Sequence, residues 1–413
     1  MSDDDRTTTS DDRTTTSDDG RVTTRRQLLR AAVNGSVATG IAALSPIDDV
    51  LAAGDDAVTI TYAYAREDPA DPATLRPRTK TVPGDWYRAV AGAFDVHDRL
   101  VDVDVPGLLG SAVVPGSYDA PMASIAVDVL PDAESVLTDG VPELLRSVEF
   151  VTNVVEGLDP PGDANADETI EYVDRLPLPN VPGGVPCGHG DSLGTLSPSL
   201  FDEDGRRYFV TSNHLFGKTD EAAETSEESS DGSEGSEQSS DGSDEHSDKS
   251  LLVYVDEESE RVAGRVDDRF PKQDFVLARP TDELRPTNAV AAPGPSTVAG
   301  QFTRIGLADL AARGEPLRKV GARTGFTEGQ IHGVDGVTCY AGDRCRRGQL
   351  RWGSESTFDD GDSGSVNFRP DPERPDERVL VGALNNARTW WPGQNFTWGT
   401  AAYQMTAVNG VRF

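Results

Sequence analysis

One short motif in this chain places a hydroxyl nucleophile in a setting suited to acyl transfer. Ser363 lies in the pentapeptide GDSGS, between the strand-like runs RGQLRWGSES and SVNF. The small residues around it predict a sharp, exposed turn that lets a substrate backbone approach the hydroxyl. The backbone N–H groups of Gly361 and Ser363 are the expected donors to a developing oxyanion.

A candidate base and a candidate orienting carboxylate lie upstream of this serine. His214 closes the run RRYFVTSNH, and it is the one of five histidines that ends a hydrophobic strand among small residues. Asp274 opens the apolar run FVLA, where a carboxylate is costly unless it is paired. An imidazolium at His214 supplies that pairing, and Asp274 then holds its tautomer. The alternatives are a structural histidine and an ordinary turn aspartate, with Asp267 and Asp268 as further candidates.

The order His, Asp, Ser, carried by TSNHLF, DFVLARP and GDSGSV, resembles the chymotrypsin/trypsin-like serine peptidases, and most closely their compact microbial members. The segment RKVGARTGFTEGQI resembles the strand–turn–strand that opens the second barrel of many such enzymes. The resemblance covers roughly Val185 to Phe413. TSNHLF departs from the commoner TAAHC form, because Leu215 follows the histidine and the neighbouring disulfide is missing.

The resemblance implies two six-stranded antiparallel Greek-key barrels with the site between them. The first is expected over about Val185 to Pro280, and the second over about Val298 to Val411, with a Pro-rich strap between. Short runs rich in Val, Phe, Tyr and Leu alternate with Gly, Pro and Asp turns from residue 185 onward, which favours mainly β structure. No long stretch of this region shows helical periodicity.

The family pattern implies a serine endopeptidase that cleaves polypeptides through an acyl-enzyme and needs no cofactor. It places Thr357 at the base of the primary substrate pocket and Leu384, Asn385 and Asn386 along a wall, for a small or medium uncharged side chain. The alternative is a catalytically inactive module that binds peptides or proteins on the same scaffold. An α/β-hydrolase is excluded by motif order, because no histidine follows Ser363.

A second folded unit is expected over residues 54–160. Its pattern predicts the order βαββαβ and a ferredoxin-like sandwich, with strands and helices at Val58–Ala65, Asp85–Leu100, Gly107–Val114, Ala123–Leu130, Val141–Val148 and Glu149–Val155. This unit is either a propeptide, acting as an intramolecular inhibitor or chaperone, or a permanent accessory domain. The acidic, Pro-rich linker 161–184 joins it to the peptidase region 185–413 and is the place to cut.

Residues 1–53 are predicted to be a disordered leader followed by an export signal. The leader contains a doubled DDRTTTS, and Arg25-Arg26 precede a mildly apolar stretch in the manner of a twin-arginine signal. Val50–Ala53 offers small residues for cleavage, and the stretch is too short and polar to span a membrane. An extracellular protein without stable membrane association is therefore expected; the alternative is a basic amphipathic helix.

The charge balance indicates adaptation to strong salt. The formal net charge is −33 and the sequence pI is about 4.4, with only five lysines. Molar salt shortens the Debye length to about 3 Å and screens the repulsion between these carboxylates. Such a surface argues against a nucleic-acid partner, because phosphates are bound by Lys and Arg.

The remaining features concern an insertion and the cysteines. The insertion 218–249 is low in complexity and rich in Ser, Glu, Asp and Gly, and it is predicted to be a disordered loop; a calcium-collecting loop is the alternative. Cys339 and Cys345 flank YAGDR and can close a hairpin disulfide, or Cys187 can pair with one of them. No metal site is expected, because the cysteines form no CxxC motif.

Overall fold

The computed structural model describes residues 50–53, 56–103, 105–133, 147–158, 169–217, 250–340 and 344–413. Strands dominate the described part, in one sheet of seven strands and one of sixteen. The mainly β fold class is therefore confirmed. The insertion 218–249 and the Arg25-Arg26 motif lie outside the described residues. In the described part, no helix is long and apolar enough to cross a membrane.

The region before residue 160 has the four strands and the first helix that the sequence predicts, with two further strands, β1 and β3. They are β1 (Val50–Ala53), β2 (Ala57–Arg66), the 3₁₀ helix η1 (Pro72–Thr74), β3 (Leu75–Pro83), α2 (Gly84–Asp102), β4 (Leu108–Val114), β5 (Ser124–Val129) and β6 (Glu149–Val154). Helix α2 buries a stripe that includes Trp86, Val90, Phe94 and His97, spaced as one face of a helix requires. Most of the predicted second helix lies outside the described residues.

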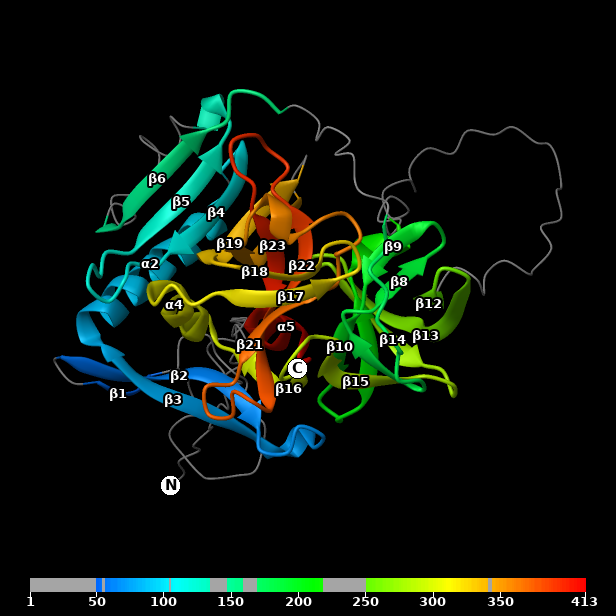
Figure 1. Cartoon of the computed structure of the whole chain (residues 1–413). Coiled ribbons are helices and arrows are strands. Elements are labelled where there is room, and N and C mark those ends of the chain that lie inside the picture. The colour runs from blue at the N-terminus through cyan, green and yellow to red at the C-terminus, as the bar shows by residue number, and fades with distance from the viewer. Residues whose placement is uncertain are drawn as a thin grey trace, which may run out of the picture. The chain divides into compact units, whose positions relative to one another are not determined.

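These strands do not form a ferredoxin-like sheet, so that part of the fold prediction is wrong. Strand β2 pairs with β1, β3 and the later strand β16 (Thr297–Phe302), whereas β4, β5 and β6 pair in that order and join β19 (Ile331–Tyr340). In Figure 1 the cyan strand β4 lies between β5 and β19. The unit was predicted from element order alone, which does not specify which strand edges meet. The division into domains at residue 160 stays a prediction.

The first predicted barrel corresponds closely to the seven-stranded sheet. Its order is β10-β11-β14-β13-β12-β8-β9, and its neighbours are antiparallel. The strands are β8 (Pro186–His189), β9 (Ser192–Thr195), β10 (Ser197–Phe201), β11 (Arg207–Thr211), β12 (Ser250–Asp256), β13 (Ser259–Phe270) and β14 (Phe275–Pro280). The 3₁₀ helix η3 (Asn213–Phe216) follows β11 directly. This sheet has seven strands where six were expected.

The second predicted barrel lies within the larger sheet. Its elements are β7 (Asn180–Gly183), β15 (Arg285–Val290), β16, β17 (Leu317–Gly321), β18 (Gly325–Gly329), β19, β20 (Arg344–Trp352), β21 (Val366–Pro370), β22 (Arg378–Arg388) and β23 (Thr397–Ala401), with the 3₁₀ helix η5 (Glu355–Thr357). The Pro-rich strap forms β15, which pairs with β7 and β16.

Two short helices lie in this region, in which no long stretch of sequence shows helical periodicity. They are α4 (Arg304–Ala312) and α5 (Ala402–Asn409). The first seven residues of α4 are all buried, so the helix shows no polar face and no readable periodicity in sequence.

The cysteines pair as the hairpin spacing indicated. Cys339 and Cys345 form a disulfide between β19 and β20. Cys187 on β8 is a buried free thiol whose pKa is raised to about 12 by burial.

Candidate active site

The carboxylate of Asp274 makes two hydrogen bonds to His214. Its Oδ2 lies 2.7 Å from His214 Nδ1, and its Oδ1 accepts the backbone N–H of His214 at 2.9 Å. The Asp274 side chain is 1% exposed and the His214 side chain 41% exposed. Because Nδ1 faces the carboxylate, Nε2 is left as the ring nitrogen that can exchange a proton with a substrate or nucleophile. The sequence expectation that these two residues lie together is met.

Local backbone geometry explains how Asp274 reaches this position. It ends the turn between β13 and β14 with a φ of +54°, a left-handed conformation that aspartate tolerates better than most residues. Its carbonyl accepts the N–H of Asn213 at 3.2 Å, which ties this turn to η3. Burial alone would raise the pKa of Asp274, but His214, and next the guanidinium of Arg346, hold the pKa below its ordinary value. Asp274 is therefore an anion.

The Ser363 turn is braced by the other sheet. Thr195 on β9 donates its hydroxyl to the carbonyl of Gly361 at 2.8 Å, and its N–H donates to the carbonyl of Ser363 at 2.8 Å. Gly361 has a φ of +105°, which glycine adopts without strain. Within the described residues, the N–H groups of Gly361 and Ser363 donate to no protein acceptor. Such unpaired donors are what an oxyanion site requires.

The hydroxyl of Ser363 does not bond to His214 in this structure. It donates instead to the backbone carbonyl of Asn386 at 3.2 Å. The same residue turns its side-chain amide toward Asp274, donating Nδ2–H to the carboxylate Oδ2 at 3.2 Å and to the backbone carbonyl at 3.1 Å. Asn386 thus joins the serine to the aspartate, and the serine reaches His214 only after its hydroxyl leaves the Asn386 carbonyl. Catalytic hydrogen bonds often tighten only when substrate binds.

Asp362, inside the GDSGS motif, anchors the turn from behind. Its Oδ2 lies 2.8 Å from Lys319 Nζ, and both side chains are fully buried. The N–H of Arg323 and the hydroxyl of Thr324 also donate to it, at 2.8 and 2.7 Å. Burial alone would raise the pKa of Asp362, but Lys319 and these donors hold the pKa below its usual range. A buried ion pair with satisfied hydrogen bonds fixes the turn that carries the nucleophile.

The predicted substrate-binding side chains lie mostly inside the protein. Leu384 is fully buried in a cluster with Val366 and Val379. Asn385 accepts from Trp352 Nε1 at 2.8 Å and is also fully buried. These two side chains therefore do not face a substrate, because β22 is buried on both of its faces at this point.

Thr357 and Asn386 are the other two predicted pocket residues. Thr357 is 4% exposed and its hydroxyl is engaged within η5, donating to the carbonyl of Ser354 at 2.7 Å. Asn386 lies beside Asp274 and donates its side-chain amide to that carboxylate. The identity of the substrate pocket therefore stays a prediction.

Four contributors to this site escaped sequence analysis: Thr195, Lys319, Arg346 and Asn386 in its role beside the aspartate. One signal was available for Lys319, since it is one of only five lysines and lies in the apolar strand LRKVG. The other three act through contacts between residues distant in sequence, which no local motif records.

A groove lies next to the site in the described part of the chain. A groove of about 550 Å³ lies beside the turn; Leu193 and Arg323 line it and also contact the position a Gly361 side chain would occupy. Carboxylates of Asp191, Asp256 and Glu260 line it as well. In the described residues, no group of three or more His, Cys, Asp or Glu side chains is placed to hold a metal ion.

Several solved structures are similar to this chain, at low identity. One is described as a glutamic acid specific serine protease that utilizes a novel histidine triad in substrate binding; it is 18% identical with a TM-score of 0.37, over 56% of this chain and 99% of that one. Thermobifida fusca Protease A is 18% identical with a TM-score of 0.36, over 56% and 97%. Nocardiopsis Protease is 19% identical with a TM-score of 0.35, over 56% and 98%.

No protein-family model matches the sequence, and no curated protein matches it.

Proposed function

We propose that this chain is a serine endopeptidase that hydrolyses peptide bonds through an acyl-enzyme. One observation carries the proposal. A buried, ionised Asp274 holds the ring of a half-exposed His214, and Asn386 links that aspartate to a serine in a turn with unpaired N–H donors. This is the arrangement that nucleophilic catalysis by serine needs.

The proposed reaction has two balanced halves. Ser363 Oγ attacks the peptide carbonyl while its proton passes to His214 Nε2, and the N–H groups of Gly361 and Ser363 receive the oxyanion. Collapse breaks the C–N bond, and the same proton passes from Nε2 to the leaving amine. Water then gives a proton to His214, attacks the acyl-enzyme, and releases the carboxylic acid as Ser363 regains its proton. Asp274 stabilises the imidazolium in both halves.

The activity is proposed to occur outside the cell in strong salt. The support is the net charge of −33 and the Arg25-Arg26 motif. Screening of the acidic surface in molar salt then stabilises the fold.

The N-terminal region is proposed to act as an intramolecular chaperone or inhibitor of the peptidase region. The support is its pairing with that region at two places. Strand β2 pairs with β16, and strand β4 pairs with β19. Strand addition of this kind supplies backbone hydrogen bonds over a long edge.

The first test is covalent labelling of the full chain with a fluorophosphonate probe in multimolar salt. Wild type should label, and the Ser363→Ala variant should not. Ser365→Ala serves as the matched control, because that serine lies two residues away, fully buried, and should leave labelling intact. Labelling that survives in Ser363→Ala would contradict the proposal.

A second candidate function is a peptide-binding module without catalysis. The bond from the Ser363 hydroxyl to the Asn386 carbonyl favours it, since a serine held there cannot transfer its proton to His214. A folded wild type that binds peptides but neither labels nor cleaves them would establish this alternative.

A further inference from the structure

A basic side chain from the β19–β20 hairpin reaches the triad aspartate. Arg346 Nη1 lies 3.0 Å from Asp274 Oδ2, and the two side chains are 19% and 1% exposed. The same oxygen is the one that faces His214 Nδ1 at 2.7 Å and accepts from Asn386 Nδ2 at 3.2 Å. One buried oxygen, Asp274 Oδ2, therefore contacts the imidazole of His214, the guanidinium of Arg346 and the side-chain amide of Asn386.

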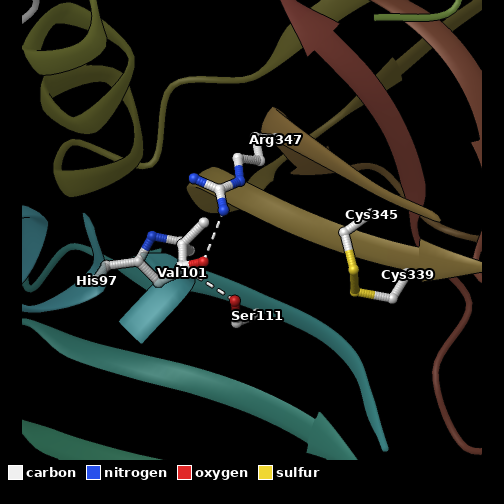
Figure 2. Close-up of a disulfide and its surroundings, with 6 residues drawn as sticks. All are labelled: His97, Val101, Ser111, Cys339, Cys345 and Arg347. Carbon is white, nitrogen blue, oxygen red and sulfur yellow. Dashed lines mark hydrogen bonds between the residues drawn. A yellow bond between two sulfur atoms is a disulfide. The ribbon is translucent and has the colours of Figure 1, made fainter. Parts of the chain in front are cut away.

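The hairpin that carries Arg346 is fastened on both sides. Its neighbour Arg347 points away and donates to the carbonyl of Val101 at 2.7 Å and to Asp102 at 3.1 Å, at the end of helix α2. Figure 2 shows the bond to Val101 and the disulfide that closes the hairpin. That disulfide involves Cys345, the residue next to Arg346. Adjacent residues of a strand point to opposite faces, so one arginine reaches the triad and the next one the helix.

The other charged groups around the histidine are engaged elsewhere. Arg269 on β13 donates to Asn213 Oδ1 at 2.8 Å and to the carbonyl of Gly217 at 2.9 Å. His189 on β8 stacks on Phe216 and contacts the carbonyl of Ser250 at 3.0 Å. On β14, Arg279 is exposed and pairs with Asp267. Behind the serine, Lys319 and Asp362 neutralise one another.

From this geometry we infer that Arg346 is a positioning residue of the candidate triad, which rests on the proposed function. Its guanidinium fixes the Asp274 carboxylate against His214 through the same oxygen that faces Nδ1. A second cation beside the same carboxylate disfavours charging of the imidazole, because like charges a few ångströms apart repel. Burial keeps this effect from being screened by salt to the degree of a surface pair.

The test compares the pH dependence of the fluorophosphonate labelling rate in wild type and in Arg346→Gln, with the full chain in both cases. The acidic limb of the fluorophosphonate labelling rate should move to higher pH by about one unit. Arg346→Lys keeps the charge and should recover most of that shift. Arg347→Gln is the matched control, because it removes the same charge one residue away on the exposed face. The acidic limb of its labelling rate should coincide with that of wild type.

A readout that needs no activity separates this inference from the proposed function. The ring of His214 is followed by NMR in histidine-labelled protein and assigned with His214→Gln. In Arg346→Gln, the midpoint of that titration should rise by the same amount as the acidic limb. A variant that lowers labelling equally at all pH values, with an unmoved midpoint, would overturn the inference and reduce Arg346 to a structural ion pair. Absence of labelling in wild type would instead remove the proposed function, and the NMR comparison would still decide for or against Arg346.

Discussion

Two aspartates in this molecule have nearly the same kinds of neighbour, but the histidine beside one is exposed and the histidine beside the other is buried. Asp274 and Asp335 both adopt positive φ, +54° and +57°, and each lies beside a histidine and an arginine. The partners are His214 and Arg346 for the first, and His97 and Arg304 for the second. Each histidine also has a serine in its neighbourhood, Ser363 in one region and Ser111 in the other.

The difference lies in distance and exposure. His214 Nδ1 is 2.7 Å from its aspartate and its side chain is 41% exposed, whereas His97 Nδ1 is 3.8 Å from Asp335 and its side chain is 1% exposed. His97 also uses its Nε2 on Ser111 at 2.8 Å. The second cluster joins α2 and β4 to α4 and β19, and no substrate can enter it. Residue types alone therefore do not distinguish the two clusters; the exposure of the imidazole does.

The largest contrast is expected between the two serines. Ser363→Ala should lower peptide hydrolysis by a factor on the order of 10⁶, since it removes the nucleophile. Ser111→Ala should leave hydrolysis near wild type and cost about 1–3 kcal/mol of unfolding free energy, because His97 loses a buried partner. Assays of hydrolysis paired with denaturant unfolding measure both. An equal loss of hydrolysis in the two variants would contradict the assignment of Ser363 to catalysis and of Ser111 to structure.

The second largest contrast is expected between the two aspartates, and at Asp274 it should appear in kcat. Asp274→Asn is expected to lower kcat by about 10⁴, because the amide no longer orients His214 or stabilises its charged form. Steady-state kinetics on a peptide substrate measure this effect. A loss below about tenfold would show that the Asp274 contact does not serve catalysis.

At Asp335, replacement by Asn should lower the stability of the fold. Asp335→Asn leaves the buried Arg304 guanidinium without its nearest carboxylate, and we expect a loss of about 3 kcal/mol of unfolding free energy. The folded fraction should keep its kcat. Urea unfolding in constant high salt gives the stability, and a kcat that falls with it would indicate that the two clusters are coupled.

The smallest expected effect concerns acid stability. Burial opposes ionisation of Asp274 and Asp335, yet His214 at the first and Arg304 at the second hold both pKa values below the ordinary range. A depressed pKa contributes stability above the unfolded value, near pH 4, that is lost as pH falls through the folded value. Unfolding free energies measured from pH 5 to pH 2 should therefore fall less steeply in either Asn variant than in wild type. An unchanged slope would count against ionised aspartates.

Sequence reasoning succeeded where a local pattern decides structure. The β character of the chain from residue 185 onward and helix α2 follow from composition and periodicity, and the disulfide between Cys339 and Cys345 is one of the pairings that the spacing allowed. The pairing of Asp274 with His214 was also foreseeable, because an aspartate before an apolar strand needs a partner.

The sequence could not predict which strand edges pair with one another. The sequence of the six N-terminal strands does not show that β2 pairs with β16 and β4 with β19, since any exposed edge offers the same backbone groups. Arg346 was missed for a similar reason, because its contact spans 72 positions along the chain (346 minus 274).

The buried thiol of Cys187 gives this protein an intrinsic reporter. It is the free cysteine of the chain, it lies on β8, and burial with a pKa near 12 keeps it unreactive while the sheet stays closed. An alkylating reagent can therefore modify it only when the seven-stranded sheet opens. The rate of modification, followed by mass spectrometry in native buffer, would time the opening of the half of the molecule that carries His214 and Asp274, without any engineered label.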